Sequence, residues 1–225
     1  MTTEEEGTPP RKGYRRGVSA GTRYGSGVST SRLERLSDGV YAIAATLLIL
    51  DVQASGSPLG HQLLRIWPSY VAYAVSFLTI GEIWANQHTM FTQIDRVDRA
   101  FILINVVFLM AVAFIPFPTR IVAEHALDNG AKAAALTYGI TISITAALSI
   151  GQWFYASTRH RLLKADADPR TVAAISRSWV VGPLTFPVAT LVALASPSAS
   201  LLLYGGITVF YLFESPWFGQ ATRAD

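Results

Sequence analysis

Residues 32–50 have the sequence RLERLSDGVYAIAATLLIL, which decides the kind of fold that this chain can adopt. The second half of the stretch is almost wholly apolar, whereas Ser37 and Asp38 stand about one turn inside its start. A carboxylate at that depth in a membrane helix is costly unless a partner offsets its charge. The stretch therefore predicts a membrane helix whose polar residues have a specific task.

The apolar half of this stretch has a helical repeat. Ile43, Thr46 and Leu50 follow one another at intervals of three and four residues, so they share one helix face. Thr46 lies about 16 Å along the axis from Arg35, at a rise of about 1.5 Å per residue. That distance is near the midplane of a bilayer whose hydrocarbon is about 30 Å thick. Spacing alone favours ordinary packing for this face, with the Thr46 hydroxyl bonded to its own backbone.

Working outward, the whole chain has the composition of an all-α membrane protein. Only 15 % of its 225 residues are charged, against about 25 % in soluble domains. Residues 71–80, 101–117 and 133–150 carry no charge at all. A membrane span needs about 20 mostly apolar residues, and several segments meet that requirement.

Six transmembrane helices are predicted within one membrane domain, residues 31–217. A basic, disordered tail (1–30) precedes this domain and a short tail (218–225) follows it. Ser31 is expected to cap the first helix with Glu34 as its capping-box partner. Pro116 and Pro118 are expected to end the third helix, and Pro183 and Pro187 to kink the fifth. The predicted helices are 32–52, 66–95, 97–117, 131–157, 178–195 and 199–213.

The distribution of basic residues predicts the orientation. With both termini in the cytoplasm, fifteen of the 18 Lys and Arg residues fall on the inner side and three on the outer side. This bias agrees with the positive-inside rule. The single set of six helices and the Ala- and Arg-rich composition predict a prokaryotic source, and hence a multi-pass protein of the plasma membrane. The cytoplasmic excess of Lys and Arg also explains the pI of about 9.3 without a nucleic-acid partner. The basic run 159–164 is therefore interpreted as topogenic, at the lipid headgroups, and not as a ligand site.

Cofactor and redox sites find little support in the sequence. There is no cysteine, so disulfides and thiolate metal sites are excluded. The four histidines are scattered, and none is paired at a spacing typical of metal ligands. No cofactor is expected.

The second predicted helix offers partners for Asp38. Its second half, from Trp84 to His88, is polar and returns to the inner half of the membrane, where Asp38 also lies. Trp84 and His88 are four residues apart and so share a face. We expect a buried network that fixes the first helix against the second; its members would be Arg32, Ser37, Asp38, Asn86 and His88.

These residues carry a resemblance. The pattern Arg32-x-x-x-Leu36-Ser37-Asp38 resembles the Arg-x-x-x-Phe-Ser-Asp signature of the transmembrane protein 175 family, the endosomal/lysosomal potassium channels and their prokaryotic relatives. The spacing Ile43-x-x-Thr46-x-x-x-Leu50 is also similar to that family's first helix, as is the run 67–70 with Trp84 and His88. Leu36 departs from the pattern, which has Phe at that position. The similarity spans about residues 31–215.

The resemblance implies a homotetrameric, modestly selective potassium channel, whose pore is lined by the first helix of each subunit. It implies an apolar ring of Ile43 at the narrowest point, a hydroxyl ring of Thr46 and a further apolar ring of Leu50. Leu36 and the polar residues around it would be structural, with Trp84 and His88 beneath. The permeating potassium ion would be the only metal. In agreement, the sequence has no Thr-Val-Gly-Tyr-Gly filter segment.

Three other functions stay open at this stage. A secondary transporter would need broken helices and usually an internal repeat; the prolines of the fifth helix suit it, but no repeat is evident. An intramembrane enzyme would have to use Glu82, His88 or Asp38, and no known catalytic motif surrounds them. A membrane scaffold would conduct nothing. For Asp38 a structural pairing is favoured over ion binding, and for His88 a buried, satisfied ring over a pH sensor.

Overall fold

The computed structural model describes residues 29–53 and 58–214, apart from the side chains of 178, 180–183 and 212–214. The predicted tails therefore lie outside the described residues, except for positions 29 and 30. In the described ranges the regular structure is helical, with one isolated bridge between Ile94 and Leu163. The prediction of an all-α protein is confirmed.

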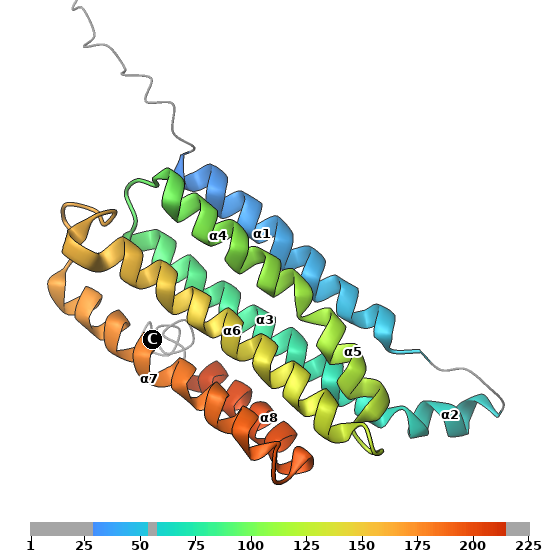
Figure 1. The fold of residues 1–225 in the computed structure, drawn as a ribbon. Coiled ribbons are helices and arrows are strands. Elements are labelled where there is room, and N and C mark those ends of the chain that lie inside the picture. The colour runs from blue at the N-terminus through green and yellow to red at the C-terminus, as the bar shows by residue number, and fades with distance from the viewer. Residues whose placement is uncertain (1–28, 54–57, 215–225) are drawn as a thin grey trace, which may run out of the picture.

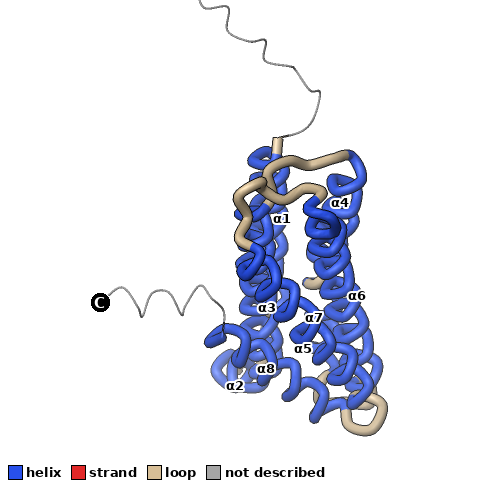
Figure 2. Tube along the Cα trace, turned by 90° about the vertical axis from the view of Figure 1, so that its left-hand side faces the viewer, coloured by secondary structure: helices blue, strands red, loops and turns tan. Residues whose placement is uncertain are grey.

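Long helices run side by side along one direction, and their connections gather at two ends (Figures 1 and 2). The elements in chain order are α1 (Thr30–Leu47), η1 (Leu48–Asp51), α2 (Leu59–Arg65), α3 (Trp67–Gln93), α4 (Arg99–Phe114), α5 (Pro116–His125), α6 (Ala131–Ser157), η2 (Thr158–His160), α7 (Pro169–Val192) and α8 (Pro197–Glu214).

The first two predicted helices are largely right, with two corrections. Helix α1 begins at Thr30, so Ser31 lies inside it, and Ser29 occupies the cap position without a side-chain hydrogen bond to the backbone of the first turn. The predicted capping box is therefore wrong. The chain before α3 is not only a turn, because α2 forms there and meets α3 at 48°.

Proline positions explain the other boundary errors. Pro116 does not end the third span; it opens α5, and the helical path continues to His125. A proline at the first turn of a helix costs little, because its missing N–H would have had no partner there. Pro169 likewise opens α7, nine residues before the predicted start, and the Asp168 side chain caps it by accepting from Arg170 and Thr171 N–H. Helix α7 is continuous through 183 and 187.

Among the described residues, two stretches are long and apolar enough to cross a membrane, Arg99–His125 and Ala131–His160. The bent pair α2 and α3 makes a third if it is counted as one span. The protein is thus a helical protein with membrane-capable helices.

One face of α1 packs into the bundle. Leu33, Ser37, Tyr41 and Ala44 are all buried, as is Leu48 at the start of η1. Their spacing of three and four residues places them on one side of the helical path. This side contacts α3 and α4. The two helices therefore hold α1 along its length and determine which side of it faces outward.

Hydroxyl groups and a glycine join the C-terminal helices to the rest. Thr79 of α3 and Thr208 of α8 are hydrogen-bonded at 3.0 Å, and the Tyr204 hydroxyl donates to the Phe186 carbonyl of α7 at 2.9 Å. Gly139 of α6 lies where a Cβ would meet Tyr204 and Thr190. Small residues and hydroxyls at such contacts are typical of helices that associate in membranes.

Candidate functional site: the outward face of the first helix

The side of α1 opposite to its buried face is open. Ile43 and Leu50 are 61 % and 60 % exposed. Gly39, which precedes Ile43, and Thr46, which lies between Ile43 and Leu50, are exposed as well. These four residues follow at intervals of four, three and four, so they form one continuous stripe. The three residues predicted to line a pore therefore share a surface that no part of the described subunit covers.

Thr46 keeps its backbone-directed hydrogen bond. Its hydroxyl lies 2.9 Å from the carbonyl oxygens of both Ala42 and Ile43. A hydroxyl has one proton to donate and two lone pairs that can accept. The proton is used within the helix, so the oxygen can turn its lone pairs toward a cation outside it.

Two polar contacts tie α1 to α3. The Trp84 indole donates to Asp38 Oδ1 at 2.9 Å, and one turn away His88 Nδ1 lies 3.1 Å from Glu34 Oε1. The Trp84 and His88 rings stack with centroids 6.0 Å apart. The sequence predicted that Trp84 and His88 share a face near Asp38, and the structure brings these groups together. Glu34 joins this group as the partner of His88, although the sequence predicted it as part of a helix cap.

A buried chain of amides lies behind this pair. The Gln87 amide donates to Asn105 Oδ1 at 2.7 Å, and the Asn105 amide lies 3.3 Å from Ser37 Oγ. Ser37 in turn donates to the Leu33 carbonyl. All of Ser37, Gln87 and Asn105 are nearly inaccessible. Neutral side chains that satisfy one another in this way specify one packing arrangement of three helices.

Gln87 and Asn105 were not predicted from the sequence. Each has a detectable signal: Gln87 lies in the polar run of α3, and Asn105 is the lone strongly polar residue of an apolar segment, 101–117. Of the residues that were predicted, Arg32 and Leu36 are exposed and Asn86 is half-buried. The buried hydrogen bond from α3 to α4 is thus made by Gln87 and not by its neighbour Asn86. One step along a helix turns a side chain by about 100°, so the two residues face different directions.

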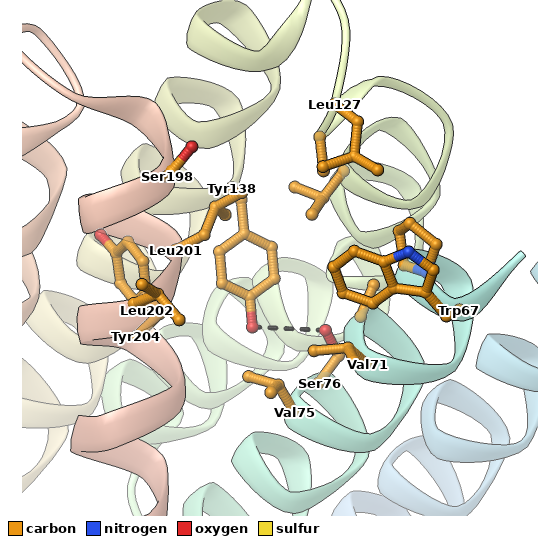
Figure 3. Close-up of a pocket in the computed structure, with 14 residues that line it drawn as sticks. Trp67, Val71, Val75, Ser76, Leu127, Tyr138, Ser198, Leu201, Leu202 and Tyr204 are labelled. Atoms are coloured by element: carbon orange, nitrogen blue, oxygen red, sulfur yellow. Dashed lines mark hydrogen bonds between the residues drawn. The ribbon is translucent and has the colours of Figure 1, made fainter. Parts of the chain in front are cut away.

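A separate pocket lies between α3, α5, α6 and α8 (Figure 3). It has a volume of about 270 Å³, and its walls are mostly apolar, with Trp67, Val71 and Leu202 among them. Inside it the Ser76 hydroxyl and the Tyr138 hydroxyl are 3.3 Å apart. No charged side chain lines this pocket, so it offers a desolvated cation no countercharge.

The described residues contain no group of three or more His, Cys, Asp or Glu side chains that could hold a metal ion. The polar groups around α1 are instead paired with one another. Their arrangement orients a helix and leaves a stripe of aliphatic and hydroxyl side chains free to meet another surface.

Comparison with known proteins finds similar sequences and a similar fold. Residues 32–116 match the family model described as "Endosomal/lysosomal potassium channel TMEM175". A potassium channel of Streptomyces collinus is 35 % identical over 190 residues, which are 82 % of this chain and 92 % of that protein. A potassium channel of Chamaesiphon minutus is 36 % identical over 193 residues, 83 % of this chain and 95 % of that one.

A solved structure is also similar. The crystal structure of a lysosomal potassium-selective channel TMEM175 homolog from Chamaesiphon minutus superposes with a TM-score of 0.76. The two are 32 % identical, and the match covers 83 % of this chain and 98 % of that one. Sequence and fold agree over nearly the whole length of these relatives, and the chain therefore belongs to the TMEM175 family.

Proposed function

We propose that this chain is the subunit of a passive potassium channel and that four copies meet around an axis, each presenting α1 to a central pore. The observation that carries the proposal is the open stripe on α1. Ile43 and Leu50 are about three-fifths exposed, while the opposite face of the same helix is held by a buried hydrogen bond between Ser37 and Asn105 of α4. A second buried bond joins Asn105 to Gln87 of α3. A helix fixed this firmly presents the same face in every copy.

In this proposal each subunit crosses the membrane six times, with both termini in the cytoplasm of a prokaryotic cell. The spans are α1 with η1, α2 with α3, α4 with α5, α6, α7 and α8. The excess of Lys and Arg on the proposed inner side supports this orientation. An even number of membrane crossings, such as six, is required if both tails lie on the same side of the membrane.

The pore chemistry follows from the side chains of the stripe. Four Ile43 side chains around an axis make an apolar constriction, and such constrictions can close by dewetting. Four Thr46 hydroxyl oxygens, about one turn along, offer weak ligands to an ion that has lost part of its water. Potassium sheds water more readily than sodium, so an apolar neck favours it. The preference is modest, because no full cage of carbonyl oxygens surrounds the ion.

The names of the relatives point to channels and not to enzymes or carriers. An enzyme built on Glu82, His88 and Asp38 is disfavoured further, because Asp38 and His88 are each engaged by another side chain. A transporter gains no support from the apolar pocket, which lacks charged groups.

The test is electrical recording from full-length protein reconstituted in lipid bilayers. Ile43→Ala removes most of the proposed neck and should raise unitary conductance and lower the preference for potassium over sodium. Ile144→Ala is the matched control, because Ile144 of α6 is also exposed, at 52 %, but lies outside α1. Equal currents and permeability ratios in both variants and the wild type would remove the pore assignment.

A further inference from the structure

Two connections distant in sequence are joined at one end of the bundle. The α3–α4 loop and the α6–α7 connection form the bridge between Ile94 and Leu163. Asp95 N–H donates to the Leu162 carbonyl and Lys164 N–H to the Gln93 carbonyl, each at 3.0 Å. Leu162 and Leu163 are buried, so the α6–α7 connection is anchored to the core.

The joined connections and the end of α6 surround a second pocket. It has a volume of about 680 Å³, within the range of typical ligand sites of about 300–1,000 Å³. Four of its seven lining residues are basic, and none is acidic; the lining is Arg96, Phe154, Tyr155, Thr158, Arg159, His160 and Arg161. This pocket lies away from the stripe on α1.

Two of the basic side chains are held by the protein itself. The Arg161 guanidinium is 3.3 Å from Asp98 Oδ2 and lies 4.7 Å above the Tyr155 ring. Arg96 Nη2 donates to the Arg161 carbonyl at 3.1 Å. The Asp98 carboxylate is thus engaged by Arg161 and by the Tyr155 hydroxyl. Within the described residues, it makes no ion pair with the remaining two basic positions of the lining.

Those two positions are Arg159 and His160. Both are exposed, and neither side chain has a hydrogen bond or an ion pair within the described ranges 29–53 and 58–214. Both have a left-handed backbone, with φ of 55° and 52°. Two consecutive residues with a Cβ rarely adopt this conformation, and such strain persists where the surrounding structure imposes it, often at binding sites.

We propose that this pocket binds a phosphate group, carried either by an anionic lipid headgroup or by a soluble phosphate. Arg159 and His160 would contact the phosphate oxygens, and Arg96 would add charge from the other loop. Basic pockets at the ends of membrane helices are suited to lipid headgroups. The sequence alone predicted only a topogenic role for the run 159–164. In this proposal the first part of that run also binds a ligand.

The experiment measures binding to full-length protein in a non-ionic detergent. The probes are dioctanoyl phosphatidylglycerol and, for comparison, dioctanoyl phosphatidylcholine, followed by isothermal titration. The test variant is Arg159→Asn with His160→Asn, because asparagine tolerates a left-handed backbone. Lys164→Asn is the matched control: it removes a charge from the same connection, but Lys164 does not line the pocket.

The expected result is that phosphatidylglycerol binds the wild type and Lys164→Asn alike, and the double variant roughly tenfold more weakly or worse. Competition by inorganic phosphate would identify the phosphate itself as the ligand; no competition would assign the site to the lipid headgroup. Equal binding by the double variant and the wild type overturns the proposal. So does equal binding of phosphatidylcholine, in which the choline cation offsets the phosphate charge, or an equal loss in Lys164→Asn.

Discussion

The indole nitrogen of Trp84 donates a hydrogen bond to the carboxylate of Asp38 at 2.9 Å, and this contact joins α3 to α1. Asp38 lies beside buried Ser37 and one turn before buried Tyr41. A change in the contact therefore acts on the rotation of α1 about its own axis. The same rotation sets the direction of the stripe formed by Ile43, Thr46 and Leu50.

Trp84→Phe tests that contact. Phenylalanine keeps an aromatic ring but has no N–H, so Asp38 loses its indole donor. We expect a loss of about 1–2 kcal/mol in stability, typical of a hydrogen bond to a charged group that solvent partly reaches. Asp38→Asn is the comparison, because its amide oxygen still accepts, and it should cost less. Melting temperature in detergent is the measurement, and no shift for Trp84→Phe would contradict the assignment.

Asn105→Leu tests the buried amide chain. The change leaves the Gln87 amide without its acceptor. It also removes the Asn105 amide that donates to Ser37 Oγ. Each buried polar group left unsatisfied costs about 1–3 kcal/mol, so the variant should unfold at a clearly lower temperature. A double variant, Gln87→Leu with Asn105→Leu, leaves fewer unpaired groups and should recover part of the loss. If the single variant melted with the wild type, the amide chain would not be a stabilising feature.

Two glycines of the same helix should respond in opposite ways to alanine. At Gly139 a Cβ would lie 2.6 Å from the Tyr204 hydroxyl and 2.7 Å from Thr190 Oγ1, so Gly139→Ala forces α7 and α8 away from α6. We expect a loss of about 1–3 kcal/mol from overpacking. Gly151→Ala meets nothing within 4 Å and should gain up to about 1 kcal/mol in helix propensity. Thermal denaturation compares the two, and a Gly139→Ala variant as stable as Gly151→Ala would contradict this packing.

Thr46→Val tests the hydroxyl ring. Valine has nearly the same shape, so a change in permeation would report the loss of an oxygen and not of volume. We expect a lower potassium-to-sodium permeability ratio with an open pore. Thr137→Val is the control, because Thr137 of α6 is half-buried, lies outside α1 and donates to its own backbone at 2.8 Å as Thr46 does. Reversal potentials under mixed-salt conditions measure the ratio, and identical ratios for Thr46→Val and wild type would exclude Thr46 from the pore.

Asp98 predicts a pH dependence of stability. Burial by itself raises the pKa of this carboxyl, but hydrogen bonds from Phe101 N–H and the Tyr155 hydroxyl, with the Arg161 charge, hold the pKa below its ordinary value of 3.8. A carboxyl whose pKa is lower in the folded state contributes stability above the unfolded pKa and loses it as the pH falls through the folded pKa. Stability should therefore fall below about pH 4.

The control for that titration is Asp98→Asn. It removes the charge at every pH, so the variant should be less stable than the wild type near neutrality and should approach it in acid. Chemical denaturation at a series of pH values measures the difference. A constant gap between the two proteins from pH 3 to pH 7 would show that Asp98 does not contribute in this way.

Much of the fold was predictable because a helix that crosses a membrane needs a long run of apolar residues, which the sequence shows directly. The α6 boundaries, 131–157, were predicted residue for residue, since that segment is a long apolar run between polar loops. The errors in the predicted helix boundaries occurred at prolines. The residue type alone does not distinguish a proline that ends one helix from one that opens the next, and Pro116 and Pro169 open theirs. The separate helix α2 was missed because seven residues carry too weak a periodic signal.

The sequence by itself determined the class of the protein, the rough positions of its long helices and the three residues on one face of α1. These follow from composition and from the 3.6-residue repeat, which are local properties. Only the tertiary structure decided that this face is the uncovered one, that Gln87 and Asn105 secure the other, and that Arg96 lies beside Arg161. Such contacts join residues up to 68 positions apart, and no local pattern determines how distant helices rotate against one another when they pack.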